Sequence, residues 1–134
     1  MIGELNHIAI AVPNTDEAAK PYKNTFGAEV SKPLDQPLHG VQVVFITLPN
    51  TKIELISPLG ADSPISKFLG RNPNGGIHHI CYEVKSIDAA IYKLSKENYK
   101  ILGSSVPKLG AHGKPVIFLH PSEFNNTLIE LQEK

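Results

Sequence analysis

Two histidines and two glutamates occupy matching places in the two halves of this chain. His7 and His79 each open an apolar run, and Glu54 and Glu130 each lie inside a later one. Taken singly, such residues are ordinary parts of amphipathic strands. Together, two imidazoles and two carboxylates form a mixed nitrogen and oxygen set that suits a divalent ion. Four such ligands on an octahedral ion leave two positions for substrate or water. The coincidence therefore favours a metal site.

An internal repeat accounts for the matching positions. The run His7–Val12 resembles His79–Val84, and an acid follows nine residues after each histidine, at Asp16 and Asp88. Later segments match as well: Val44-Phe45-Ile46 with Ile117-Phe118-Leu119, and Ile53-Glu54-Leu55 with Ile129-Glu130-Leu131. Each copy reads as a strand, a helix and then further strands. The chemistry-bearing residues therefore belong to equivalent strands of two related modules.

The period of two along a strand predicts which way these side chains point. Ile53 and Leu55 flank Glu54, and Ile129 and Leu131 flank Glu130, so the apolar pairs take the opposite face. Both acids should therefore leave the hydrophobic layer and point to the face that the two histidines share.

Helix signals are clear at three places. Asn14 with Glu17 resembles a capping box, Gly27 is a stop signal, and Pro21 should shorten or kink the helix. A second helix is expected from after Ser86 to about Glu97, with Asn98 as its stop. A third, short helix is expected with Ser63 as N-cap and Pro64 as first residue. Strands are expected at Leu5–Val12, Val41–Leu48, Lys52–Ser57, Ile77–Val84, Lys100–Leu102, Pro115–Leu119 and Thr127–Gln132.

The fold class is α+β, and the 134 residues suit a single domain, 1–134. Module one covers about 4–58, a connecting helix and linker about 59–76, and module two about 77–134. A chain of this size buries about two-thirds of its unfolded surface, which is enough for a core without disulfides.

Composition excludes several functions. Thirteen basic and thirteen acidic residues give zero formal charge, so no nucleic-acid partner is expected. No apolar run reaches the roughly 18 residues that span a membrane. The single cysteine, Cys81, excludes an internal disulfide and suits a reducing compartment. We expect no leader segment in this sequence, and localisation in the cytoplasm of a prokaryote or, for a processed eukaryotic form, in the mitochondrial matrix.

The chain resembles the vicinal-oxygen-chelate superfamily, in which two tandem βαβββ modules form a mixed-sheet cleft around one metal site. Within it, the methylmalonyl-CoA epimerase family is the best match. The segments that carry the resemblance are Leu5–Pro13, Asn50–Leu55, Gly75–Cys81 and Gly110–Pro121. The Gly-Gly-x-His-His and Gly-Ala-His-Gly-Lys-Pro segments are the more specific ones.

The resemblance implies a reaction. A divalent ion at His7, Glu54, His79 and Glu130 would chelate oxygens of a methylmalonyl-CoA substrate and stabilise the enolate left when the α-proton departs. Co²⁺ is the ion expected, with Mn²⁺, Ni²⁺, Zn²⁺ and Mg²⁺ as alternatives. Reprotonation on the other face would interconvert the (2R) and (2S) epimers, so acid/base groups are needed on both faces.

Two residues are the acid/base candidates. Glu130 qualifies because a ligating carboxylate keeps a second oxygen, and Lys52 because it shares the expected cleft face with Glu54. Some relatives carry a carboxylate on the strand 40–45, and this chain has none there. His112 and Lys114, in a Gly-rich loop, are candidates for binding the substrate carboxylate or the phosphates of coenzyme A, although a plain surface loop would look the same.

Two other functions compete. A glyoxalase I-like lyase would use the same modules, but its glutathione site is usually rich in arginine and this chain has only Arg71. A non-enzymatic drug-binding protein of the bleomycin-resistance type needs no metal ligands, so the four matched residues argue against it. The family often pairs protomers, and we expect a homodimer in which each chain supplies a complete ligand set.

Overall fold

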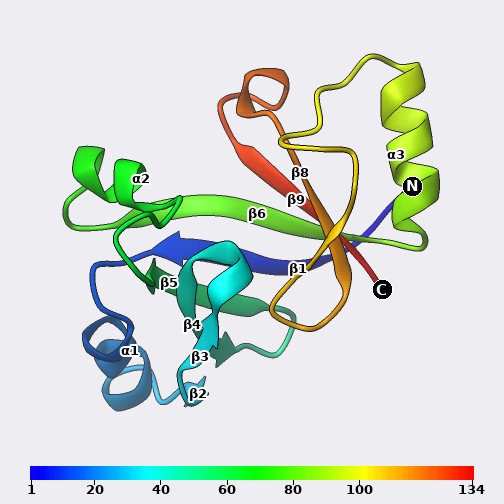
Figure 1. Ribbon diagram of the computed structural model, residues 1–134. Helices are drawn as coiled ribbons and strands as arrows, with labels where there is room; N and C mark the ends of the chain where they lie inside the picture. The colour runs from blue at the N-terminus through cyan, green and yellow to red at the C-terminus, as the bar shows by residue number, and fades with distance from the viewer. The chain divides into compact units, whose positions relative to one another are not determined.

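The computed structural model describes residues 1–134 and has the predicted mixed α+β content. The chain divides into two compact units: an N-terminal unit, His7–His78, and a C-terminal unit, Met1–Asn6 with His79–Lys134. The expectation of a single domain stays a prediction. The elements are β1 (Ile2–Ala11), α1 (Thr15–Asn24), β2 (Glu29–Val30), β3 (Leu34–Gln36), η1 (Pro37–His39), β4 (Val41–Thr47), β5 (Lys52–Pro58), α2 (Ser66–Arg71), β6 (Gly76–Val84), α3 (Ile87–Lys96), β7 (Lys108–Leu109), β8 (Pro115–Leu119), η2 (Pro121–Glu123) and β9 (Leu128–Glu133) (Figure 1).

In the N-terminal unit, a mixed sheet has a helix on each face. β1 pairs parallel with β5, β4 pairs antiparallel with β5, and β2 and β3 pair with β4. Helix α1 packs on one face, where Ala19 meets Val44 and Leu55. Residues from the α2 region, including Ile65 and Phe68, pack on the other face. Alternate side chains of β4 and β5 therefore pack into two separate hydrophobic layers, one on each face of the sheet.

In the C-terminal unit, β6 pairs parallel with β9, β8 pairs antiparallel with β9, and β7 pairs with β8. Helix α3 covers one face of this sheet, with Ala90 and Leu94 in its buried cluster. Ile129 and Leu131 point into that cluster, as the alternation predicts. Glu130, between them, therefore lies on the face away from α3.

The caps of the two long helices confirm the predictions. The Asn14 side chain accepts a hydrogen bond from the Glu17 N–H, and the Ser86 side chain accepts one from the Ala89 N–H. Helix α1 ends three residues after Pro21, and Gly27 beyond it has a φ of 65°. The stop after α3 is Asn98, which adopts the left-handed conformation with a φ of 62°.

Two predicted elements are wrong. Helix α2 begins at Ser66 rather than after Ser63, because the Ser63 hydroxyl donates to the Gly40 carbonyl oxygen at 2.6 Å instead of capping the helix. The predicted strand 100–102 is reduced to one bridge between Ile101 and Leu119. Short strands at β2, β3 and β7 were not predicted, because two or three residues carry no readable period.

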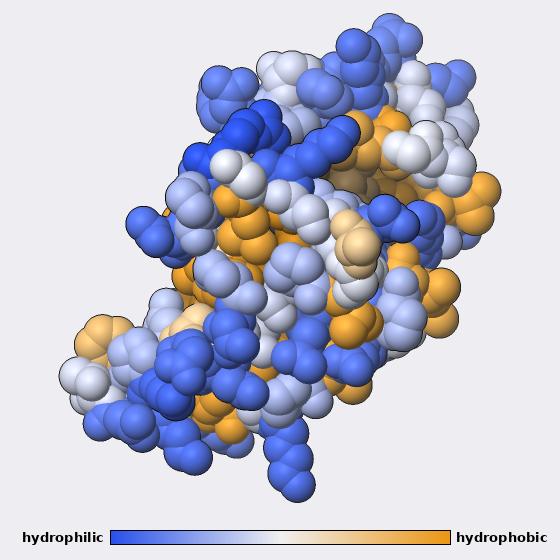
Figure 2. Space-filling model, turned by 60° about the vertical axis from the view of Figure 1, so that its left-hand side comes forward, coloured by the Kyte–Doolittle hydropathy of each residue, from blue (hydrophilic) through white to orange (hydrophobic).

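Several large hydrophobic residues are exposed in each unit. Phe26 and Leu38 in the N-terminal unit, and Tyr92 and Val106 in the C-terminal unit, are exposed large hydrophobic residues. Figure 2 shows a mainly hydrophilic face with hydrophobic residues in several separate places. No helix in the structure combines the length and apolar character required to cross a bilayer.

Candidate metal and proton-transfer site

In the N-terminal unit, His7 and Glu54 form a buried pair. The parallel register sets Ala9 of β1 opposite Glu54 of β5, and His7 opposite Lys52. His7 Nε2 lies 3.2 Å from Glu54 Oε2. His7 is 2 % exposed and Glu54 is 6 % exposed. The pair exists because two adjacent parallel strands each turn one polar side chain away from the α1 layer.

In the C-terminal unit, His79 and Glu130 form the equivalent pair. The register sets Cys81 of β6 opposite Glu130 of β9. His79 Nε2 lies 2.9 Å from Glu130 Oε2, and both residues are 5 % exposed. The His79 ring also packs edge-on against Phe118 of β8, with 5.4 Å between the ring centroids.

The two pairs are built by the same strand relationships. Each glutamate has a small residue opposite it on the parallel neighbour, Ala9 or Cys81, and a phenylalanine opposite it on the antiparallel neighbour, Phe45 or Phe118. The sequence repeat thus becomes a structural repeat of a buried imidazole beside a buried carboxylate.

The geometry of each pair fits a divalent ion. Two ligands at right angles on one ion lie about 3 Å apart when each metal bond is about 2.1 Å. The separations of 3.2 Å and 2.9 Å match this value. Buried carboxylates are costly unless a positive charge or a metal compensates them. Each pair can therefore supply one nitrogen and one oxygen ligand, and the chemistry of the donors suits a borderline or hard divalent ion.

The remaining predicted residues lie in different settings. Lys52 is half-buried on β5 and lies on the same side of that strand as Glu54. His112 and Lys114 are exposed in the turn before β8. The Lys114 ammonium group donates to the Lys134 carbonyl oxygen at 3.5 Å. Lys52 thus lies in the N-terminal unit with the His7–Glu54 pair, and the loop candidates lie in the C-terminal unit with Glu130.

Two features around the carboxylates escaped the sequence analysis. Phe45 lies opposite Glu54, and Phe118 lies opposite Glu130, on the antiparallel neighbouring strands. Both phenylalanines belong to the sequence repeat, so their equivalent positions could have been predicted from it. Gly110 is the other feature. A Cβ at Gly110 would lie 3.7 Å from Glu130 Oε1, a proximity that no sequence spacing reveals.

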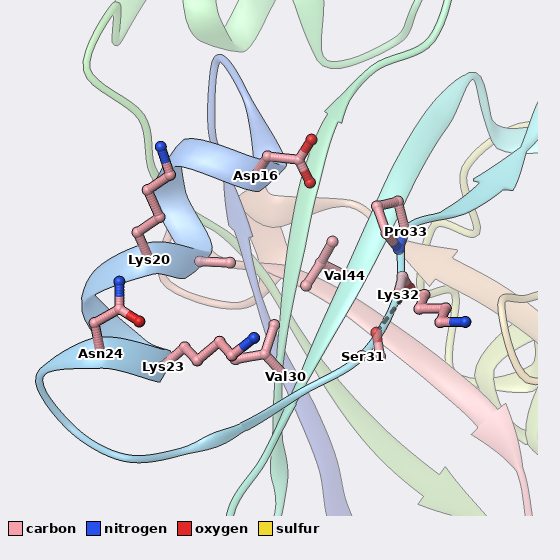
Figure 3. A pocket seen from close by; sticks show the side chains of 10 residues that line it. Asp16, Lys20, Lys23, Asn24, Val30, Ser31, Lys32, Pro33 and Val44 are labelled. Atoms are coloured by element: carbon pink, nitrogen blue, oxygen red, sulfur yellow. Dashed lines mark hydrogen bonds between the residues drawn. The ribbon is translucent and has the colours of Figure 1, made fainter.

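A cavity of about 430 Å³ lies elsewhere in the N-terminal unit, between α1 and residues 30–33. Its floor includes Val44, which belongs to the α1 layer, so it lies on the other face of the sheet from Glu54. Lys20 on its rim donates to Glu17 at 2.7 Å, and that hydrogen bond raises the pKa of Lys20. Figure 3 shows the Lys20 and Lys32 side chains pointing away from each other.

Comparison with known proteins identifies the fold family. Residues 6–118 match the glyoxalase/bleomycin resistance protein/dioxygenase superfamily. The chain belongs to this superfamily. Proteins of the glyoxalase superfamily commonly bind a divalent metal, in agreement with the donor chemistry of the two pairs.

Individual relatives narrow the similarity within the superfamily. The chain is 62 % identical over 133 residues to an ethylmalonyl-CoA/methylmalonyl-CoA epimerase of Cereibacter sphaeroides, covering 99 % of both chains. It is 54 % identical to the human mitochondrial methylmalonyl-CoA epimerase, covering 98 % of this chain and 74 % of that protein. A solved methylmalonyl-CoA epimerase in complex with methylmalonyl-CoA and NH₄⁺ superposes with a TM-score of 0.91 at 26 % identity, covering 100 % of this chain and 96 % of that one. The chain therefore belongs to the methylmalonyl-CoA epimerase family, which confirms the prediction made from the sequence. The relatives give no support to the lyase or drug-binding alternatives.

Proposed function

We propose that this chain is a metal-dependent epimerase that interconverts (2R)- and (2S)-methylmalonyl-CoA. The observation that carries the proposal is the 62 % identity to an ethylmalonyl-CoA/methylmalonyl-CoA epimerase along essentially the full length of both chains. The repeated His–Glu pair supplies the chemistry that such a reaction needs. Ethylmalonyl-CoA is the second substrate to test, because the name of that relative includes it.

In this proposal, His7, Glu54, His79 and Glu130 hold one divalent ion jointly, and Co²⁺ is the first ion to test. Support comes from the ligand-like separation inside each pair and from the burial of all four side chains. The bound ion supplies Lewis-acid stabilisation of the negative charge that develops on the substrate oxygens. Mn²⁺, Ni²⁺, Zn²⁺ and Mg²⁺ are the alternatives, since the nitrogen and oxygen donors do not select one of them.

The proton transfers are assigned to Glu130 and Lys52. Glu130 takes the α-proton from C2 onto its carboxylate, and the Lys52 ammonium group gives a proton to the opposite face of C2. The C2–H bond on one face breaks, a C2–H bond on the other face forms, and exchange with water resets both groups. Glu130 qualifies because its Oε2 faces His79 while its Oε1 is a separate oxygen. Lys52 qualifies because it is half-buried on the strand that carries Glu54.

His112 and Lys114 are assigned to substrate binding. Both are exposed, and both lie in the turn that begins at Gly110, where a Cβ would lie 3.7 Å from Glu130 Oε1. Charge-assisted contacts from such groups suit the substrate carboxylate or the phosphates of coenzyme A.

We also propose a homodimer whose protomers each carry all four ligands. For localisation, we propose the cytoplasm if the chain is prokaryotic and the mitochondrial matrix if it is a processed eukaryotic form. The support is that the human relative is named as mitochondrial and another relative is bacterial.

The test is an epimerase assay on purified protein with single epimers of methylmalonyl-CoA, after chelation and again after addition of Co²⁺. We expect interconversion that chelation removes and Co²⁺ restores. The matched control is His7→Ala/His79→Ala, which should fold and remain inactive with Co²⁺. Turnover of the glutathione hemithioacetal of methylglyoxal without epimerisation would favour the lyase, and bleomycin binding without either activity would favour the drug-binding protein.

A further inference from the structure

Gly110 begins the tight turn that precedes β8. Its N–H donates to the Lys114 carbonyl oxygen at 2.9 Å, and the Gly113 N–H donates to the Gly110 carbonyl oxygen at 3.0 Å. Gly110 is buried, whereas His112 and Lys114 at the tip are exposed. Gly113 has a left-handed φ of 70°, whereas the φ of Gly110 lies outside the left-handed region. The backbone alone therefore does not require glycine at position 110.

The space around Gly110 gives a different reason for glycine. A Cβ there would lie 2.9 Å from Val116 Cγ1 and 3.7 Å from Glu130 Oε1. The first distance demands that Val116 shift, while the second is ordinary van der Waals contact. A methyl group at position 110 would thus fill the volume directly beside the second carboxylate oxygen of Glu130.

The two units differ at this point. Val43 lies two residues before Phe45, as Val116 lies two before Phe118, so the repeat makes the valines equivalent. Val43 is packed in a cluster with Ile65, Val41 and Phe68. Val116 instead meets the bare backbone of Gly110. Apolar side chains therefore cover Val43 in the N-terminal unit. In the C-terminal unit, a glycine without a side chain lies against Val116.

We propose that Gly110 is a positioning residue that keeps the volume beside Glu130 Oε1 clear for the α-carbon of the substrate. This inference rests on the proposed epimerase function and deepens it. Glu130 Oε2 faces His79, so Oε1 is the oxygen that reaches the reacting carbon. A base must come within about 3 Å of the group whose proton it takes. A methyl group at position 110 displaces the α-carbon, and a displacement of about 1 Å costs roughly 100-fold in rate.

The test compares Gly110→Ala, Val116→Ala and the double variant with the wild type. Val116→Ala makes room for a methyl group at position 110, so the double variant removes the clash but keeps the occupied volume. We expect Val116→Ala to stay within about threefold of the wild-type kcat, and both variants with Ala at position 110 to fall by about 100-fold. The Kd for Co²⁺, measured by calorimetry, should stay within about threefold in all of them, because Oε2 and His79 are untouched.

Recovery of the wild-type kcat in the double variant would show that only the Val116 clash matters, and would overturn the proposal. A Gly110→Ala protein with wild-type kcat would overturn it too. If Gly110→Ala alone fails to fold, the double variant decides. A wild-type protein that binds Co²⁺ but never epimerises methylmalonyl-CoA would instead refute the proposed function.

Discussion

Nε2 of His79 lies 2.9 Å from Oε2 of Glu130, on the face of β6 and β9 that α3 leaves uncovered. This separation fits a hydrogen bond between the two groups, and it also fits two neighbouring ligands on one ion. The same relationship recurs between His7 and Glu54 at 3.2 Å. The same strand arrangement thus occurs twice, and each unit supplies one imidazole nitrogen and one carboxylate oxygen.

Loss of one histidine should remove the ion. In His79→Ala, the remaining ligands no longer complete the coordination geometry, so bound Co²⁺ should drop at least about tenfold in affinity and epimerase activity should vanish. Metal content after dialysis measures the first effect. The control is His120→Ala, which loses a histidine bonded to Ser122 rather than to a glutamate. One equivalent of Co²⁺ held at wild-type affinity by His79→Ala would contradict the ligand assignment.

The two glutamates should respond differently to amide substitution. An amide oxygen can still bind a metal, but an amide cannot accept the α-proton. Glu54→Gln should therefore keep bound Co²⁺ and part of the activity, whereas Glu130→Gln should lose about 100-fold or more in kcat. Steady-state kinetics on Co²⁺-loaded proteins measure the contrast. Equal losses in the two variants would show that Glu130 has no role beyond ligation.

Lys52→Ala should separate proton abstraction from inversion. The variant should keep its metal and lose epimerisation, yet still exchange the C2 proton of one epimer with solvent, because abstraction by Glu130 survives. Nuclear magnetic resonance in D₂O follows the exchange. Lys93→Ala, on α3 in the other unit, is the matched control and should behave as wild type. Wild-type epimerisation by Lys52→Ala would remove Lys52 from the mechanism.

A stability prediction concerns the cap of α3. Ser86→Ala deletes the acceptor for the Ala89 N–H, so the free energy of unfolding should fall by about 1 kcal/mol. Urea unfolding measures the change. Ser86→Asp should restore most of the loss, since aspartate is as good an N-cap as serine. Stability unaffected by Ser86→Ala would mean that the cap is replaced by water.

The sequence predicted the parts of the fold that follow from period and capping. The repeat located β1, β5, β6 and β9, and alternation placed Glu130 on the face away from Leu131. Long strands and capped helices carry such signals within a few neighbouring residues.

The sequence predictions failed where the local structure depends on residues that are distant in the chain. Ser63 reads as an N-cap, but its hydroxyl bonds to Gly40, which lies 23 positions away in the chain. The approach of Gly110 to Glu130 depends on the turn and on the β8–β9 pairing together. Neither contact has a local pattern, so spacing alone could not reveal it. The joint binding of one ion by the two units stays a prediction.

The most direct measurement of the central claim is deuterium incorporation during epimerisation. The Co²⁺-loaded protein is incubated in D₂O with a single epimer of methylmalonyl-CoA, and mass spectrometry with chiral analysis follows C2. Because a group that exchanges with solvent delivers the new proton, the product epimer should carry deuterium at C2, and the chelated protein should form none. Inversion without deuterium over many turnovers, or deuterated product at the same rate after complete removal of the metal, would contradict the account.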